Sequence, residues 1–314
     1  MSLPAAALRQ CWFVAGPTAV GKTATSLRLV ERLGAEIISM DSMAIYRGMD
    51  VGTAKPTAAE RAIIPHHLVD VIDPRQEYSV AEYLAACTRA VDGILQRQRV
   101  PLFVGGTGLY LRSLLRGVFD GPEADWDLRN DLERQKEARG SAWLHQQLAE
   151  MDPVTAERLH PNDVRRVIRA IEVFRSTGRP LSDWHAQAAR PADERPACAV
   201  WLEPPRDWLY DRIDRRVDLM IDEGLFDEVR WLHALSPPAS KTARQALGYR
   251  ELLDHLDGEC DREAAVEQIK TGTRQFAKRQ HTWFRGLQEC GRIAMDGTES
   301  TDELVDAIVN AATL

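Results

Sequence analysis

The feature that most constrains this chain is a glycine-bearing turn between a short apolar run and a helical pattern. Residues 16–23 read GPTAVGKT and satisfy the pattern G-x-x-x-x-G-K-[ST] in full. The residues before the turn, 11–15, predict a strand, and apolar residues recur at helical spacing over 24–33. The N–H groups of such a loop converge on a phosphate at the positive end of the helix. The sequence therefore predicts a phosphate-binding P-loop that takes a di- or triphosphate.

The last two residues of this loop predict its chemistry. Lys22 supplies a cation for the outer phosphate, and the Thr23 hydroxyl is the expected ligand of Mg²⁺, the expected cofactor. The residues expected to bind the diphosphate are Gly16, Pro17, Thr18, Ala19, Val20, Gly21, Lys22 and Thr23. The motif leaves the transferred group open. Phosphoryl transfer to a small molecule, nucleotide hydrolysis, and displacement of diphosphate by an acceptor are all compatible with it.

Further apolar runs at 36–40, 100–104 and 198–202 predict strands, with helical patterns between the first of them. Strand–helix–strand units favour an α/β fold, with a P-loop NTPase-like parallel sheet flanked by helices on both faces. Between 119 and 198 only helical patterns occur, which predicts an all-helical domain inserted in the core. The expected boundaries are 1–119 and 198–314 for the catalytic core and 120–197 for the insertion. After Trp201 the chain is expected to be helical again.

The predicted strand ends indicate where catalysis takes place, because ligands of such sheets bind beyond the carboxyl ends of the strands. Asp41 follows the strand at 36–40, whereas Gly105 and Gly106 follow the strand at 100–104, where a hydrolysing motor carries an acid. Asp41 is therefore a candidate base facing the phosphate site, or an outer-shell metal partner. His66 and His67 have no third ligand at metal spacing and are expected to be structural.

Composition sets outer limits on function. The 314 residues include 40 Lys and Arg against 47 Asp and Glu, a net charge of −7, which taken alone argues against a nucleic-acid partner. Five cysteines without a C-x-x-C pair argue against a disulfide scaffold or zinc knuckle and favour a reducing compartment, the cytoplasm. No apolar run approaches the roughly 20 residues of a membrane helix, so no membrane partner is expected. A monomer is expected.

Six further segments match one family of proteins, in the family's order. They read DSMAIYRGMDVGTAKP (41–56), PHHL (65–68), GGTGLY (105–110), HPND (160–163), GYR (248–250) and AKRQ (277–280). Together with the P-loop they resemble the tRNA dimethylallyltransferase family over residues 11–287. One departure is Ala44, where many members have Gln, in a stretch that contacts the target nucleotide.

The resemblance implies a reaction. A dimethylallyl group moves from dimethylallyl diphosphate to the exocyclic N6 amine of adenine at position 37 of tRNA, beside the anticodon, and diphosphate leaves. Asp41 is implied as the general base, Thr107 as a hydrogen-bonding partner near the amine, and Arg216 as a diphosphate contact, with Arg212 one turn earlier as an alternative. The rival functions are an adenylate dimethylallyltransferase acting on free nucleotide, a P-loop small-molecule kinase, and a non-catalytic RNA-binding P-loop protein.

Two short stretches are basic although the chain is acidic. Residues 158–179 have six Arg against Asp163 and Glu172, and 274–292 have four Arg and one Lys against Glu289, so each has a local charge of +4. With the resemblance, these stretches and three others are expected to contact the tRNA anticodon stem-loop. The expected tRNA contacts are Asp41, Ser42, Met43, Ala44, Thr107, Arg129, Arg165, Arg166, Val167, Ile168, Arg169, Arg244, Gln245, Ala246, Leu247, Gly248, Tyr249, Lys278, Arg279, Gln280, His281, Thr282, Trp283, Phe284 and Arg285.

Overall fold

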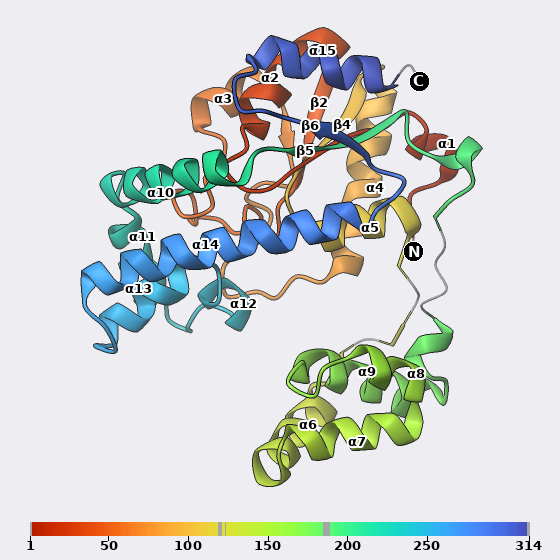
Figure 1. Cartoon of the computed structure of the whole chain (residues 1–314), viewed down its shortest axis with the longest axis vertical. Coiled ribbons are helices and arrows are strands. Elements are labelled where there is room, and N and C mark those ends of the chain that lie inside the picture. Colours follow the sequence, from red (N-terminus) through yellow and green to blue (C-terminus); the bar gives the residue numbers. More distant parts are fainter. Residues whose placement is uncertain (1, 119–120, 123, 185–188, 313–314) are drawn as a thin grey trace. The chain divides into compact units, whose positions relative to one another are not determined.

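The computed structural model describes residues 2–118, 121–122, 124–184 and 189–312 (Figure 1). It divides the chain into a core unit, 2–116 with 189–314, and a helical unit, 117–188. The boundary expected at 119–120 lies outside the described residues. The chain returns to the core unit before the expected boundary at 198, because Arg190 donates hydrogen bonds to the carbonyls of Leu115 and Leu3, both in the core unit.

The core unit contains a six-stranded sheet in the order β3-β2-β4-β1-β5-β6, and every neighbouring pair is parallel. The α/β fold with a parallel sheet is therefore confirmed, as are the strands expected from the four apolar runs. The strand bounds are Trp12–Ala15 (β1), Ala35–Met40 (β2), His66–His67 (β3), Val100–Gly105 (β4), Cys198–Glu203 (β5) and Gly291–Ala294 (β6).

The two edge strands, β3 and β6, correct the sequence-based expectation. The chain after Trp201 is not helical throughout, because Gly291–Ala294 pairs with β5. Both strands are short, and most of β6 is exposed, so neither shows the apolar run that predicts a buried strand. Edge strands of this kind leave little pattern in a sequence.

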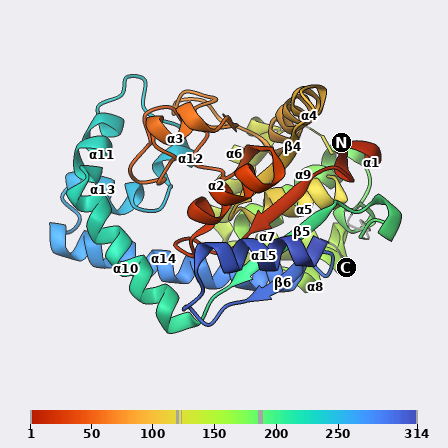
Figure 2. The ribbon, with the colours of Figure 1, turned by 90° about the horizontal axis from the view of Figure 1, so that it is seen from above.

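Helices cover both faces of the sheet within the core unit. Figure 2 looks onto α2 and α15, whose side chains Leu29 and Ile308 share one hydrophobic core with Val14 and Val200 of the sheet. The core-unit helices are Ala5–Leu8 (α1), Lys22–Leu33 (α2), Ala58–Ile63 (α3), Val80–Gln96 (α4), Gly108–Arg116 (α5), Arg206–Asp222 (α10), Leu225–His233 (α11), Lys241–Arg244 (α12), Tyr249–Leu256 (α13), Arg262–Arg285 (α14) and Thr301–Ala312 (α15), with a 3₁₀ turn at Ala192–Glu194.

A second hydrophobic core lies beside the sheet in the same unit. It packs Ile45, Tyr46 and Met49, from the segment after β2, against side chains of α10, α11, α13 and α14 such as Val217 and Tyr249. The segment that follows Asp41 is therefore anchored on helices from the C-terminal third of the chain. This packing builds the wall of the site opposite the P-loop.

The helical unit has its own core, which explains why it forms a separate compact body. Its helices are Trp126–Arg139 (α6), Ser141–Met151 (α7), Pro153–Arg158 (α8) and Val164–Thr177 (α9), with a 3₁₀ turn at Leu181–Asp183. Apolar side chains recur along one face of α9, and Val167 and Ile171 pack there against Leu144 and Leu148 of α7. Nowhere in the described ranges is a helix both long and apolar enough to cross a membrane.

Candidate functional site

The P-loop has the conformation expected for anion binding. It joins the end of β1 to the start of α2 at Lys22, and both Ala19 (φ 64°) and Gly21 (φ 106°) have left-handed backbone conformations. Gly21 occupies the N-cap position of α2, where it has no side chain to satisfy the first N–H groups of the helix. Those donors and the positive end of the helix dipole therefore remain available to a phosphate.

Two cations lie at this loop. The Lys22 ammonium donates to the carbonyls of Gly16 (3.0 Å) and Pro17 (2.7 Å). Burial and the nearby Arg216 lower the pKa of Lys22 to about 7, against the opposing effect of Asp41. Burial also lowers the pKa of Arg216, again opposed by Asp41. Within the described ranges Arg216 has no hydrogen bond or ion pair, so a bound anion would be its partner.

Arg212 lies one turn before Arg216 on α10 but has a different role. Its Nε donates to the carbonyl of Ala19 at 2.8 Å, and its guanidinium lies 4.6 Å from the ring centre of Trp208. Arg212 thus holds the backbone of the P-loop. Arg212 is thus engaged with the loop backbone, whereas the guanidinium of Arg216 remains available to an anion. This difference favours Arg216 as the diphosphate contact.

Asp41 and Thr107 are brought together by the sheet. Met40 of β2 pairs with Gly105 of β4, so the residues that follow these strands lie side by side. Asp41 Oδ1 accepts from the N–H of Met43 at 2.8 Å, and Thr107 Oγ1 accepts from the N–H of Ser42 at 3.1 Å. Oδ2 of Asp41 has no hydrogen-bond donor among the residues that the structure describes, which leaves it open to take a proton from a ligand.

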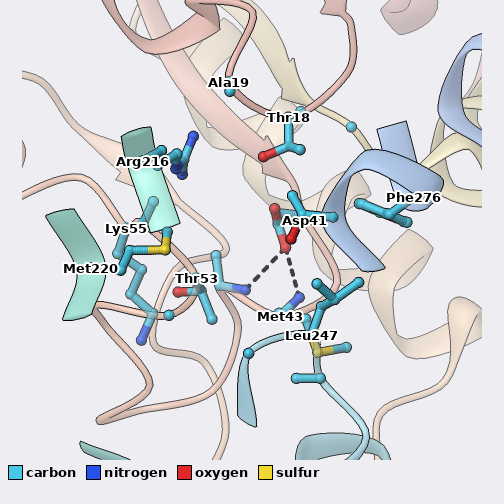
Figure 3. Close-up of a pocket in the computed structure, with 18 of the residues that line it drawn as sticks. Thr18, Ala19, Asp41, Met43, Thr53, Lys55, Arg216, Met220, Leu247 and Phe276 are labelled. Atoms are coloured by element: carbon cyan, nitrogen blue, oxygen red, sulfur yellow. Dashed lines mark hydrogen bonds between the residues drawn. The ribbon is translucent and has the colours of Figure 1, made fainter. Parts of the chain in front are cut away.

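One pocket of about 1010 Å³ joins these groups. Figure 3 shows Asp41 between Thr18 and Ala19 of the P-loop on one side and Met43 and Leu247 on the other. The phosphate side is lined by cations, and the opposite side is partly apolar. The apolar lining side chains include Met43, Val217, Leu219, Met220, Leu225, Leu247, Ile269 and Phe276. The pocket therefore suits a ligand with a charged end and a hydrocarbon end.

Sequence reasoning missed the residue that fixes one wall of this pocket. Glu228 on α11 accepts the N–H groups of Asp50 (2.7 Å), Val51 (2.8 Å) and Gly52 (3.0 Å). It also accepts from the hydroxyl of Tyr249, which is buried. Glu228 is about 177 residues along the chain from these partners, and no local pattern links the two segments.

The metal expectation can be tested against the residues present. The described residues contain no cluster of three or more His, Cys, Asp or Glu side chains that could hold a metal. A P-loop needs none, because Mg²⁺ there takes one hydroxyl ligand and the remaining oxygens from phosphate and water. Thr23 is exposed and lines the pocket, so its hydroxyl fits that role. His66 and His67 bind the Ile64 carbonyl and Glu36 instead.

The expected tRNA contacts of the core unit fall into two groups. Phe284 is 1% exposed and packs against Trp201, which makes the expectation of an RNA contact by its side chain wrong. The buried members are Ala44, Ala246, Gly248, Tyr249, Gln280 and Phe284. The exposed or half-buried members are Asp41, Ser42, Met43, Thr107, Arg244, Gln245, Leu247, Lys278, Arg279, His281, Thr282, Trp283 and Arg285. Lys278, His281, Thr282 and Arg285 line a second cavity of about 490 Å³.

In the helical unit the expected contacts differ in burial and in pairing. Val167 and Ile168 belong to its hydrophobic core, so their side chains are not RNA contacts. Arg129 and Arg169 both bind the carboxylate of Glu172, which is completely buried. Arg165 and Arg166 lie on the exposed side of α9, as expected from their spacing opposite the apolar face. The charge count alone did not distinguish these two kinds of arginine.

Comparison with known proteins agrees with this geometry. The chain is 46% identical to a tRNA dimethylallyltransferase of Halothermothrix orenii over 88% of its own length and 84% of that protein. It is 38% identical to a tRNA isopentenylpyrophosphate transferase from Bacillus halodurans, with a TM-score of 0.70 and 97% of each chain covered. A eukaryotic dimethylallyltransferase acting on tRNA matches with a TM-score of 0.77 at 27% identity, covering 96% of this chain and 79% of that one.

Two family models match the sequence. The model described as isopentenyl transferase matches residues 9–64, which contain the P-loop and Asp41. The model described as IPP transferase matches residues 44–287, which contain Thr107 and Arg216 and more than half of the chain. Together with the relatives, these matches show that the chain belongs to the IPP transferase family.

Proposed function

We propose that this protein transfers a dimethylallyl group from dimethylallyl diphosphate to the exocyclic N6 amine of adenine at position 37 of tRNA, releasing diphosphate. The observation that carries the proposal is the single pocket that joins an open phosphate loop to an open carboxylate oxygen on Asp41. A P-loop kinase can also combine a phosphate loop with a carboxylate base, so these two features alone do not separate the functions. The apolar side chains that line the same pocket favour a diphosphate with a hydrocarbon end over a nucleotide.

The diphosphate end of the reaction depends on the P-loop. The loop N–H groups, Lys22 and Arg216 bind the diphosphate, and their positive charge stabilises the negative charge that grows as the allylic C–O bond breaks. The electron pair of that bond leaves with the diphosphate. We propose Mg²⁺ as the metal; the Thr23 hydroxyl would hold it, and it would supply further charge neutralisation.

The acceptor end of the reaction depends on Asp41. The adenine amine is a poor nucleophile because its lone pair is delocalised into the ring. As the N–C bond forms, Oδ2 of Asp41 takes a proton from the amine, and the Thr107 hydroxyl orients it. The Oδ1 atom remains bound to the Met43 N–H, which fixes the carboxylate in place.

The target base must leave its stack to reach this pocket, since the chemistry takes place on an atom inside a folded loop. We propose that the exposed basic residues of both units hold the RNA around the extruded base. In the helical unit these are Arg165 and Arg166, and in the core unit Lys278 and Arg279. Arg165→Ala should weaken tRNA binding and flatten its dependence on salt, because each phosphate contact releases counterions.

One assay separates the proposal from its rivals. The protein is incubated with dimethylallyl diphosphate labelled in the hydrocarbon, Mg²⁺, and unmodified tRNA with adenine at position 37. Label in the tRNA and release of diphosphate in equal amounts are expected. A tRNA with guanine at position 37 is the matched control and should stay unlabelled. Label in free adenylate instead, or ADP formed from ATP and a small molecule, would contradict the proposal.

A further inference from the structure

The side chain of Gln280 bridges the P-loop and the end of β4. Its Oε1 accepts from the N–H of Thr18 at 3.0 Å, and its Nε2 donates to the carbonyl of Gly106 at 2.8 Å. Gln280 is only 4% exposed. Both ends of its amide are therefore satisfied inside the protein, which is a poor arrangement for reading an RNA base.

Gly106 provides the space for this bridge. A Cβ atom at Gly106 would lie 2.3 Å from Nε2 of Gln280, closer than two such atoms can approach. β4 is hydrogen-bonded to β1, the strand that leads into the P-loop, and it ends in Gly105 where a hydrolysing P-loop protein has an acid. Gly106 thus makes room for the Gln280 amide next to the phosphate loop.

The bridge acts on one short part of the P-loop. Thr18 and Ala19 form its tip, and Ala19 has a left-handed backbone conformation that is unfavourable for a residue with a side chain. Two distant side chains hold this tip, Gln280 from α14 at Thr18 and Arg212 from α10 at Ala19. Binding sites lose affinity when such support is removed, because the ligand must then order the loop.

We propose that Gln280 is a positioning residue for the diphosphate site, which fixes the tip of the P-loop, and that it is not an RNA contact. Its role in catalysis rests on the proposed function, but its role in holding the loop does not. Inorganic diphosphate is therefore the probe, because its binding requires neither tRNA nor transfer. If the transfer assay failed, the binding of inorganic diphosphate would still test whether Gln280 holds the loop.

The test compares Gln280→Ala with Gln268→Ala, an exposed glutamine on the same helix that lines neither cavity. Calorimetry with inorganic diphosphate and Mg²⁺ should show about tenfold weaker binding for Gln280→Ala, the loss expected from a buried hydrogen bond. The affinity for tRNA should stay within about twofold in a gel-shift assay, since no RNA contact is removed. Gln268→Ala should match the unaltered protein in both.

Opposite results overturn the proposal. Weaker tRNA binding with unchanged diphosphate binding would show that Gln280 contacts the RNA. Equal losses in both would indicate a general packing role. Gln280→Glu, which keeps the volume, is the second variant in case the alanine protein does not fold. It should also bind diphosphate more weakly, because a carboxylate oxygen would face the Gly106 carbonyl.

A double-mutant cycle adds a readout that general destabilisation does not mimic. Gly106→Ala should weaken diphosphate binding in the unaltered protein by displacing the Gln280 amide. In the Gln280→Ala background the same substitution should cost much less, because the atom it collides with is gone. Additive effects of the two substitutions would refute a direct contact between Gln280 and Gly106 as the basis of the effect.

Discussion

The Glu172 cluster of the helical unit and the Asp41 site of the core unit use charge in opposite ways. In the helical unit, Glu172 is completely buried and accepts from Arg129 (2.8 and 2.9 Å), from Arg169 and from the N–H of Asp125 (2.8 Å). Each charge in this cluster has a direct partner. Burial raises the pKa of Glu172, but the hydrogen bonds from both arginines prevail and leave the pKa below its ordinary value.

In the core unit Asp41 is kept apart from the two cations at the phosphate loop, Lys22 and Arg216. Within the described ranges Asp41 forms no ion pair with Lys22 or Arg216, although its charge raises the pKa of both. Oppositely charged side chains that pair with each other stabilise the packing of helices. Charged side chains that are held apart remain able to bind a ligand. We infer that the Glu172 cluster serves the fold and that the Asp41 pocket serves the reaction.

The largest expected effect follows from removing the open carboxylate. Asp41→Ala should lower kcat by about 10²–10⁴-fold, because no group remains to take the proton from the amine. The measurement is single-turnover transfer at saturating substrates, with tRNA affinity measured in parallel. Asp41→Asn is the control for geometry, since its side-chain oxygen can still accept from Met43. A loss of tRNA affinity that accounts for the whole effect would refute the role as base.

Removing the open cation should have the next largest effect. Arg216→Gln should lower kcat/KM for dimethylallyl diphosphate by about 10²–10³-fold, the usual cost of losing one donor to a developing anion. The free energy of unfolding should not fall, because Arg216 has no protein partner to lose among the described residues. Arg32→Gln, an exposed arginine on α2, is the control. If the Arg216 variant were less stable but had normal kinetics, Arg216 would serve the fold, as the arginines that bind Glu172 do, and not the reaction.

Glu172→Ala should lower stability and leave catalysis unchanged, the opposite of what is expected for Arg216→Gln. The substitution leaves two arginines and a backbone N–H without their acceptor, which should cost about 3 kcal/mol in the free energy of unfolding of the helical unit. Urea unfolding followed by circular dichroism measures the loss. Once both substrates are saturating, kcat should be unchanged, since no group of the pocket is altered. A large fall in kcat with normal stability would place Glu172 in the reaction.

The sequence predicted those parts of the molecule whose partners are close in the chain. The P-loop needs only a strand, eight residues and a helix in succession, so its whole form is visible locally. Asp41 was found because strand ends meet at one edge of a parallel sheet. Arg216 and Thr107 came from the resemblance to a family, not from pattern or spacing.

The remaining residues could not be found in this way, because their roles depend on distant partners. Glu228 binds the N–H of Val51, 177 residues away along the chain, and Gln280 binds the N–H of Thr18, 262 residues away. A count of arginines in 158–179 gives the same charge whether a guanidinium lies at the surface and pairs with the partly exposed Asp163, as Arg166 does, or binds the buried Glu172, as Arg169 does. Only the fold distinguishes a buried ion pair from a surface one, and only the surface arginine remains accessible to an RNA phosphate.

The smallest expected effect concerns the pH dependence of diphosphate binding. The pKa of Lys22 is lowered to about 7, chiefly by burial, and only the protonated ammonium attracts an anion. Affinity should therefore be full below pH 7 and should fall as pH rises, by at most about tenfold per pH unit. Calorimetry with inorganic diphosphate between pH 6.5 and 9 measures this, with Lys22→Arg as control, since a guanidinium stays charged throughout. If Lys22→Arg kept the same slope, the titrating group would lie elsewhere, and Lys22 would not be one of the separated charges that the diphosphate joins.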